Sequence, residues 1–401
     1  MTDPGTSNPD ARAVAIRDQF LLRRDVVFLN HGSFGACPGP VFEAYQRWQR
    51  ELESQPVEFF ARRAGDLMRR ARASLGGYLG TDPDDLVYVP NATTGLNIVA
   101  RSLRLNPGDE VLTTDHEYGA LDRTWQFICE MRKAVCVRAA VPLPITSREE
   151  VVEAIWSRVT PRTRVLFVSH ITPPTALILP VEDLIRRARA AGILTVIDGA
   201  HAPGQIPLAL EALGADFYAG NCHKWMCAPK GSAFLYARRE VQPLLEPLVV
   251  SWGWRSEKPG PSRFIDEHEY QGTRDLAAFL AVPSAIEFFR EHDWYAVRQE
   301  CHATAKDARR AIEALTGLPP ICPETRPDGS PWFAQMASAL LPPCNPEAFQ
   351  QRLREEFRIE VPVWNWNGRP LLRVSVQGYN TQADVDALIT AVGRMVGPLR
   401  P

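Results

Sequence analysis

The chain has 401 residues, of which 45% are hydrophobic and 23% charged, so it is long enough for two packed domains and has the composition of a globular protein. Its net charge of −2 and its interspersed arginines provide no basic stripe, which argues against a nucleic-acid binder. No segment approaches the roughly 18 uninterrupted apolar residues of a membrane helix. We therefore expect a small-molecule partner, with no nucleic acid and no membrane, and a cytoplasmic location.

The chain opens with an N-terminal arm, residues 1–25, whose first part (Met1–Arg12) is polar and lacks the apolar core of a signal peptide. Short β-rich runs then alternate with helical stretches from about residue 85 to 240, the rhythm of a parallel sheet covered by helices. Six strands are expected: Leu86–Val89, Glu110–Thr113, Arg164–Ser169, Leu194–Ile197, Asp216–Ala219 and Ala233–Tyr236. A helix over Val181–Gly192, apolar on one face, lies between two of them. The sequence predicts an α/β fold with a large doubly wound domain over residues 26–275.

The pattern changes after Pro283 to a long helical stretch, followed by strands at Trp332–Leu341 and Leu371–Val376 with a helix, Pro346–Phe357, between them. This predicts a smaller α+β domain over residues 276–401. Eight cysteines are scattered along the chain without a C-x-x-C pair. Cys222 and Cys227 suggest a metal or redox site, but buried inert thiols are favoured because no second cluster supplies further ligands, so no metal is expected.

Asp198 is the first residue that indicates chemistry. An apolar run, Thr195–Ile197, delivers it to the carboxyl end of a strand, where ligands bind in open α/β sheets. A carboxylate there keeps a pyridinium nitrogen protonated, although helix caps and ribose or metal ligands are commoner roles for such an aspartate.

Lys224 is the second signal, because it follows the strand Asp216–Ala219 in the stretch Gly220–Gly231. The 45 basic residues include 40 arginines and five lysines, so few side chains of the chain can form a Schiff base. Lys230 is the other candidate for the Schiff base, and the non-functional interpretation is that both lysines are solvated surface residues.

The third signal is Asn91–Asn97, which follows a predicted strand and opens a helix. Its small hydroxylated residues and glycine expose backbone N–H groups that suit a phosphate, although an ordinary helix N-cap looks the same.

These three signals occur in the order found in fold-type I pyridoxal 5′-phosphate (PLP) enzymes. The chain resembles their class V aminotransferase group, which includes cysteine desulfurases, and within it the isopenicillin N epimerase-like proteins. The matching stretches are Leu29–Gly35, Ser169–Ala176, Asp198–Gly204 and Gly220–Trp225.

The resemblance implies that Lys224 holds PLP as a Schiff base and shuttles a proton, and that Asp198 is the partner of the pyridine nitrogen. Thr93 and Thr94 would hold the phosphate, helped by Asn221 and His223.

The resemblance also implies roles around the cofactor ring and at a subunit interface. Tyr118 stands where the family usually has a histidine stacked on the ring, and an aromatic face can replace imidazole there. His201 flanks the phenolic oxygen, which His170 also approaches. Thr273, in Gln271–Thr273, would reach the phosphate of a partner subunit, which implies a homodimer.

For the substrate, Arg373 matches the arginine that grips an α-carboxylate, with a surface strand arginine as the alternative. His31 and Ser33, in the first matching stretch, and Trp364 are further substrate-binding candidates. Trp364 and Trp366, together with the two tryptophans of Ser251–Trp254, lie in predicted loops and suggest a platform for a bulky substrate.

The loop Glu360–Arg369 contains no cysteine, whereas cysteine desulfurases need a reactive one there. We therefore expect a secondary-metabolic lyase or epimerase, of the kind used in antibiotic biosynthesis, acting on the amino-acid part of a larger molecule. β-Elimination from a cysteine S-conjugate is placed slightly ahead of epimerisation. Oxidative decarboxylation, transamination and a PLP-fold binding or regulatory module remain as alternatives.

Overall fold

The computed structural model describes residues 9–260 and 262–397. They form two compact units. Unit 2 contains Pro40–Pro173 and Leu179–Phe288; unit 1 contains the described residues up to Gly39, the segment Pro174–Ile178 and those from Phe289 onward. No helix in these residues is both long and apolar enough to span a bilayer.

Unit 2 is built on a seven-stranded sheet in the order β2-β8-β7-β6-β5-β3-β4. Its strands are β2 Leu86–Val89, β3 Glu110–Thr114, β4 Val135–Ala139, β5 Thr163–Ser169, β6 Leu194–Asp198, β7 Phe217–Asn221 and β8 Ala233–Ala237. The strands run parallel except at β8, which pairs antiparallel with β2 and β7. This confirms the predicted α/β class.

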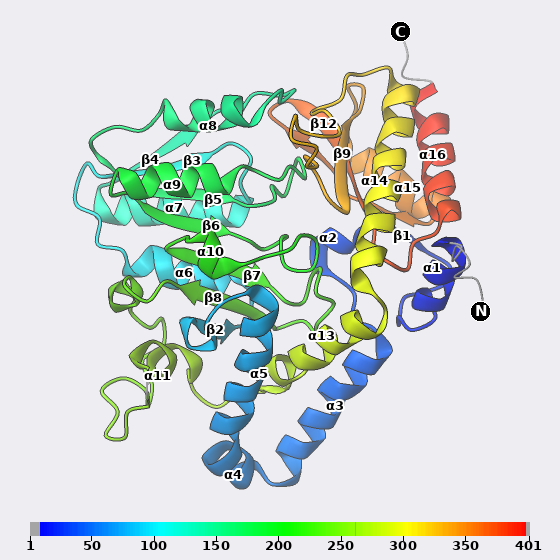
Figure 1. Ribbon diagram of the computed structural model, residues 1–401. Coiled ribbons are helices and arrows are strands. Elements are labelled where there is room, and N and C mark those ends of the chain that lie inside the picture. Colours follow the sequence, from blue (N-terminus) through cyan, green and yellow to red (C-terminus); the bar gives the residue numbers. More distant parts are fainter. Residues whose placement is uncertain (1–8, 261, 398–401) are drawn as a thin grey trace. The chain divides into compact units, whose positions relative to one another are not determined.

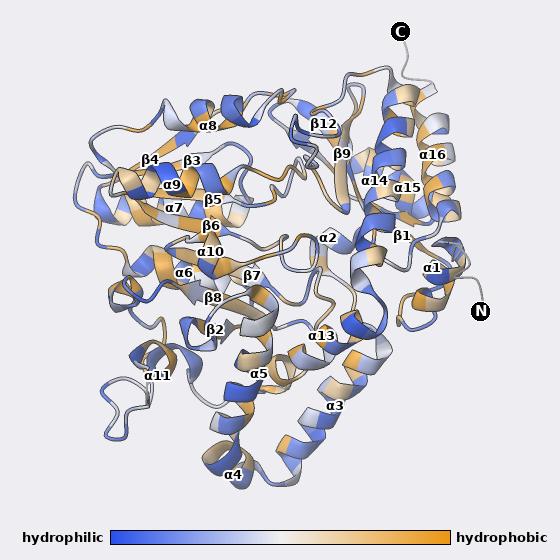
Figure 2. Ribbon diagram, in the orientation of Figure 1, coloured by the Kyte–Doolittle hydropathy of each residue, from blue (hydrophilic) through white to orange (hydrophobic). Residues whose placement is uncertain are grey.

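Helices flank both faces of this sheet (Figure 1). The helices and shorter helical turns from Gly39 to Glu291 are α3 Gly39–Ser54, α4 Pro56–Glu58, η1 Phe59–Arg63, α5 Ala64–Leu79, η2 Pro83–Asp85, α6 Ala92–Ser102, α7 Gly119–Arg132, α8 Arg148–Trp156, α9 Val181–Ala190, α10 Leu210–Leu213, η3 Gln242–Leu244, α11 Arg263–Glu269, α12 Ala277–Leu280 and α13 Val282–Glu291. Figure 2 shows the strands as mainly hydrophobic and the helices as mixed. Strands covered on both faces must be apolar throughout, which explains why their runs were readable in the sequence.

All six predicted strands are present with ends shifted by a residue or two, and α9 confirms the predicted helix. Strand β4 was not predicted. It lies at the edge of the sheet, where Val135 is 46% exposed, so its sequence lacks the continuous apolar run of a buried strand.

Unit 1 contains the short parallel pair β1 Val27–Phe28 and β10 Ile359–Glu360 and an antiparallel three-stranded sheet in the order β11-β12-β9. The strands of that sheet are β9 Met336–Leu340, β11 Val363–Trp366 and β12 Arg369–Ser375. The helices are α1 Pro9–Arg17, α2 His31–Phe34, α14 Trp294–Thr316, α15 Pro346–Phe357 and α16 Gln382–Val396.

Three local expectations for unit 1 need correction. The loose arm contains helix α1, which is anchored because Ala13 and Ile16 are buried; Met1–Asn8 lie outside the described residues. The strand predicted over Trp332–Leu341 is limited to β9. The predicted loop at Trp364 and Trp366 is strand β11, which turns into β12 through Asn367-Gly368 with φ of 48° and 80°, the left-handed pair that Asn-Gly favours in tight hairpins.

Candidate active site

Asp198 lies at the carboxyl end of β6 and is 2% exposed. Its Oδ1 accepts the backbone N–H of Ala200 at 2.9 Å, and Oδ2 has no hydrogen-bond partner in residues 9–260 and 262–397. Burial raises the pKa of Asp198, while that N–H and the nearby charge of Lys224 oppose the rise. A buried carboxyl with one bare oxygen suits a cationic N–H group.

Lys224 lies in the turn after β7, and its Nζ is 3.3 Å from Nε2 of His201. His201 belongs to the loop that follows Asp198 and is 3% exposed. Glycines let this loop pack closely: a Cβ on Gly204 would lie 2.3 Å from the backbone oxygen of Trp225, and one on Gly199 would lie 2.0 Å from the Tyr218 ring. The structure therefore brings Lys224, His201 and Asp198 together.

The N-terminus of α6 carries the residues expected at the phosphate. Asn91 caps the helix, since its Oδ1 accepts the backbone N–H of Thr94 at 2.8 Å and the Thr94 hydroxyl at 3.1 Å. Asn221, at the end of β7, accepts the backbone N–H of Ala92 at 2.9 Å. The N–H and hydroxyl of Thr93 have no partner within the described part of the chain, so this helix end combines an ordinary cap with unused donors.

These observations fit PLP. The bare oxygen of Asp198 would hold the ring nitrogen, Lys224 would bond the aldehyde carbon, and the donors of Thr93 would meet the phosphate. Asn221 would contribute its amide N–H groups, because only its oxygen is used by the helix.

The protonation of His223 does not match its expected role as a hydrogen-bond donor to the phosphate. Its Nδ1 lies 3.1 Å from the carbonyl oxygen of Ser232, an acceptor only, so Nδ1 carries the proton. Burial, and then the charge of Lys224, lowers the pKa of His223 to about 4. The neutral ring then offers an acceptor at Nε2, and it would need a second proton to donate from that atom to a phosphate.

The remaining cofactor candidates are spread along unit 2. Nδ1 of His170, which follows β5, lies 3.0 Å from the hydroxyl of Tyr218. Tyr118 precedes α7 and is 47% exposed. Thr273 is exposed between α11 and α12. No hydrogen bond among the described residues links Tyr118 or Thr273 to Lys224 or Asp198.

Glu117 is a buried acid that the sequence analysis left without a role. Hydroxyls at the ends of two strands donate to it, Thr114 to Oε1 and Ser169 to Oε2, both at 2.6 Å. Burial raises the pKa of Glu117 to about 8; the two hydroxyls oppose this and the charge of Asp198 adds to it. The sequence signal was a glutamate three residues after the last threonine of a buried strand.

The substrate candidates lie in unit 1. Arg373, on β12, is 3% exposed, and its guanidinium carbon lies 4.7 Å from the centre of the Trp364 ring. Its Nη2 donates to the Ser33 hydroxyl at 3.4 Å. Burial lowers the pKa of Arg373 to about 9, a penalty that an anionic ligand would reverse.

His31 is fully buried, and its two ring nitrogens face other side chains of unit 1. Nδ1 is 2.9 Å from the Tyr379 hydroxyl, and Nε2 is 3.2 Å from the amide nitrogen of Gln377. An amide nitrogen donates, so Nε2 accepts and Nδ1 carries the proton. His31 is therefore held inside unit 1, and Ser33 is the residue of its segment that contacts Arg373.

The remaining features singled out in the sequence are the cysteines near Lys224 and the tryptophans of Ser251–Trp254. Cys222 and Cys227 are fully buried free thiols, and burial raises the pKa of Cys222 far above that of an ordinary thiol. In the described ranges, no cluster of three or more His, Cys, Asp or Glu side chains could hold a metal ion. Trp252 is 84% exposed, and the guanidinium carbon of Arg255 lies 4.3 Å from the centre of the Trp254 ring.

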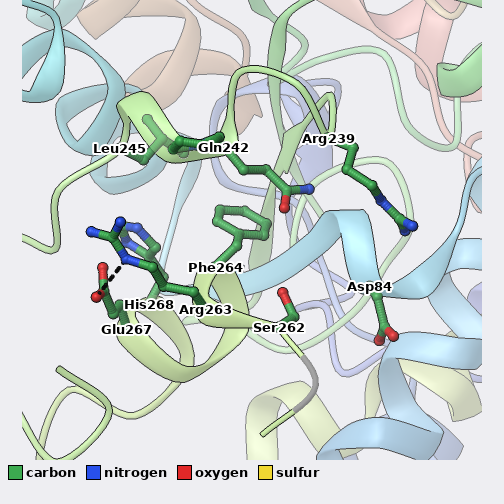
Figure 3. A pocket seen from close by; sticks show the side chains of 10 residues that line it. Asp84, Arg239, Gln242, Leu245, Ser262, Arg263, Phe264, Glu267 and His268 are labelled. Atoms are coloured by element: carbon green, nitrogen blue, oxygen red, sulfur yellow. Dashed lines mark hydrogen bonds and ion pairs between the residues drawn. The ribbon is translucent and has the colours of Figure 1, made fainter. Parts of the chain in front are cut away.

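A cavity of about 330 Å³ in unit 2 is separate from these residues (Figure 3). It is lined by Asp84, before β2, by Arg239 and Gln242, after β8, and by α11, where Arg263 pairs with Glu267 at 2.8 Å. Asp198 and Asn221 end their strands at the opposite edge of the sheet. The cavity therefore does not belong to the candidate active site.

Comparison with known proteins identifies the family of the chain. The family described as Aminotransferase class-V matches residues 35–388. Isopenicillin N epimerase of Amycolatopsis lactamdurans is 38% identical, with 94% of this chain and 96% of that protein covered. The protein of the same name from Streptomyces clavuligerus is 36% identical, covering 95% and 98%. L-cysteine desulfhydrase of Arabidopsis thaliana is 27% identical, covering 92% and 88%.

Solved structures show the same fold. The cystine C–S lyase C-DES in complex with cysteine persulfide has a TM-score of 0.80 at 21% identity, covering 92% of this chain and 98% of that one. The cysteine desulfurase CsdA of Escherichia coli has a TM-score of 0.77 at 22% identity, covering 98% and 100%. The chain therefore belongs to the class V aminotransferase family and is a PLP-dependent enzyme.

Proposed function

We propose that this enzyme removes the Cα proton from the amino-acid part of a larger substrate, with Lys224 as the base. The observation that carries the proposal is the cluster at the carboxyl edge of the sheet, where the Lys224 amine lies 3.3 Å from His201 and beside the buried Asp198. A lysine amine acts as a base in its unprotonated form, so Lys224 can take the proton once it is no longer bonded to PLP.

Each residue of the cluster has a separate task. Bound PLP supplies the electron sink for the charge left at Cα. Asp198 would hold the positive charge of the ring nitrogen, Thr93 and Asn221 would hold the phosphate, and Lys224 would take the proton. His201 would orient the lysine and donate a hydrogen bond to the phenolic oxygen of PLP.

In unit 1, Arg373 would bind the substrate carboxylate. Its guanidinium carbon lies 4.7 Å from the centre of the Trp364 ring and its Nη2 contacts Ser33. A guanidinium can present two parallel N–H groups to one carboxylate. A buried arginine at this position supports an amino acid with a free α-carboxylate as the substrate class.

Two fates of the deprotonated substrate have support. Epimerisation is the first candidate, because the relatives at 38% and 36% identity carry the name isopenicillin N epimerase. β-Elimination from a cysteine S-conjugate, which the sequence analysis placed ahead, is the second and is supported by the cysteine desulfhydrase at 27% identity. Both fates begin with loss of the Cα proton.

The test is deuterium incorporation in D2O. We expect the purified PLP-loaded enzyme to place deuterium at Cα of cysteine S-conjugates or of peptides with a free amino-acid end, as detected by NMR. Inversion seen by chiral chromatography supports epimerisation, and release of pyruvate and a thiol supports elimination. A protein with the visible absorption of lysine-bound PLP that exchanges no Cα proton in the panel would contradict the proposal.

We also propose a homodimer. Its support is Thr273, an exposed threonine whose side chain makes no hydrogen bond within the described part of its own chain and which matches the family loop that reaches a partner subunit. A monomeric mass from light scattering on the PLP-loaded protein would refute it.

A further inference from the structure

Trp225 follows Lys224 directly and is completely buried. Its indole Nε1–H donates to Nδ1 of His201 at 3.2 Å. His201 is itself buried, and the amide of Gln205 donates to its backbone oxygen at 2.7 Å. The tryptophan therefore contacts the same imidazole ring that faces the lysine.

An indole N–H has no acceptor capacity, so this contact settles which nitrogen of His201 is protonated in the neutral ring. Nδ1 must present its lone pair to the indole, and the proton must be on Nε2. Nε2 is the atom 3.3 Å from the Lys224 Nζ. The imidazole accordingly points an N–H at the lysine.

We propose that Trp225 is a positioning residue that holds His201 in the Nε2–H tautomer and so aims a donor at the nitrogen of Lys224. This inference rests on the proposed role of Lys224. A protonated lysine is an ammonium group with three donors and no acceptor, so it cannot accept a hydrogen bond from the Nε2–H of His201. The unprotonated nitrogen can accept from it, and that is the form that bonds PLP or receives a proton from Cα.

The alternative is that Trp225 serves as packing. Unit 2 contains a matched control for that alternative, because Trp125 on α7 is equally buried and its Nε1 has no hydrogen-bond partner in the described part of the chain. Trp125→Phe removes the same volume as Trp225→Phe. The two variants differ in whether a hydrogen bond to His201 is lost.

The experiment is long-range 1H–15N NMR on the PLP-loaded enzyme with 15N-labelled histidine. The sequence has eight histidines, so the His201 signals are assigned by their loss in His201→Gln. We expect the wild-type His201 to show protonated Nε2 and bare Nδ1. Trp225→Phe should move the tautomer ratio towards Nδ1–H by about five-fold, the size expected for loss of one neutral hydrogen bond. Trp125→Phe should leave the ratio unchanged.

A wild-type His201 with its proton on Nδ1, or an equal shift in both variants, would overturn the inference. A proton on Nδ1 in the wild-type spectrum overturns the inference even if Trp225→Phe does not fold. The spectrum reports the tautomer of His201 and does not depend on catalytic activity. An enzyme that failed the deuterium test could still show the Nε2–H tautomer, so failure of the proposed function can be told apart from failure of this inference.

Discussion

Glu117→Gln isolates the buried acid beside Asp198. Glu117 has a pKa of about 8 in the fold, against 4.5 for an ordinary glutamate. Between these values the folded chain binds a proton that the unfolded chain does not, so the free energy of unfolding falls as pH rises through this window. The slope for one such group is about 1.4 kcal/mol per pH unit, or about 3 kcal/mol from pH 5.5 to 7.5. Glutamine keeps the shape and cannot titrate.

We therefore expect PLP-free Glu117→Gln to gain stability relative to wild type as pH rises above about 4.5, and to differ from it by a constant amount below that pH. Urea unfolding at a series of pH values measures the difference. Glu110, at the other end of β3, is the control. Burial raises its pKa, but donors including Thr160 and Arg162 outweigh burial and lower it, so Glu110→Gln should be less stable than wild type above the ordinary glutamate pKa. Parallel profiles of wild type and Glu117→Gln would refute the reasoning.

Three further substitutions test the proposed site. Lys224→Ala should lose the visible absorption of lysine-bound PLP and Cα exchange while keeping the circular dichroism spectrum of the wild type; retained exchange would remove Lys224 as the base. Arg373→Lys should lower kcat/KM by roughly 10- to 100-fold for a substrate with a free carboxylate, from loss of a charged bidentate contact, and much less for the matching amide. Tyr118→Phe should keep cofactor stacking and elimination, so a loss confined to epimerisation would identify the phenol as a proton donor.

The sequence predicted the sheet of unit 2 well because its central strands are covered on both faces. Burial on both sides demands an unbroken apolar run, such as Val165–Val168, and such a run is visible without a structure. The same reasoning does not identify edge strand β4, because about half of its side chains face solvent and its sequence has no continuous apolar run. Strand β11 escaped for another reason: its Asn367-Gly368 turn is a hairpin signal, but the tryptophans beside it were interpreted as loop residues.

For the candidate site, strand ends were a good guide to position and a poor guide to protonation. The location of Asp198 follows from β6, whereas the protonation states of His223 and Glu117 depend on contacts with Ser232, Thr114 and Ser169 whose geometry only the fold sets. No spacing in the sequence specifies that a carbonyl fixes the His223 tautomer. The residue types were therefore predictable, and their charges needed the fold.

Those charges give the two buried acids of the carboxyl edge different tasks. Ser169, which donates to Glu117, is the register partner of Asp198 across β5 and β6, so the two carboxyls lie over neighbouring strand ends. Each negative charge would raise the pKa of the other acid, and a pair in this position separates into one acid and one base. Glu117 is held by two hydroxyls and no cation, whereas Asp198 accepts a backbone N–H and keeps a bare oxygen for a cationic group. The proton therefore belongs on Glu117, which would leave Asp198 ionised to hold the ring nitrogen of PLP.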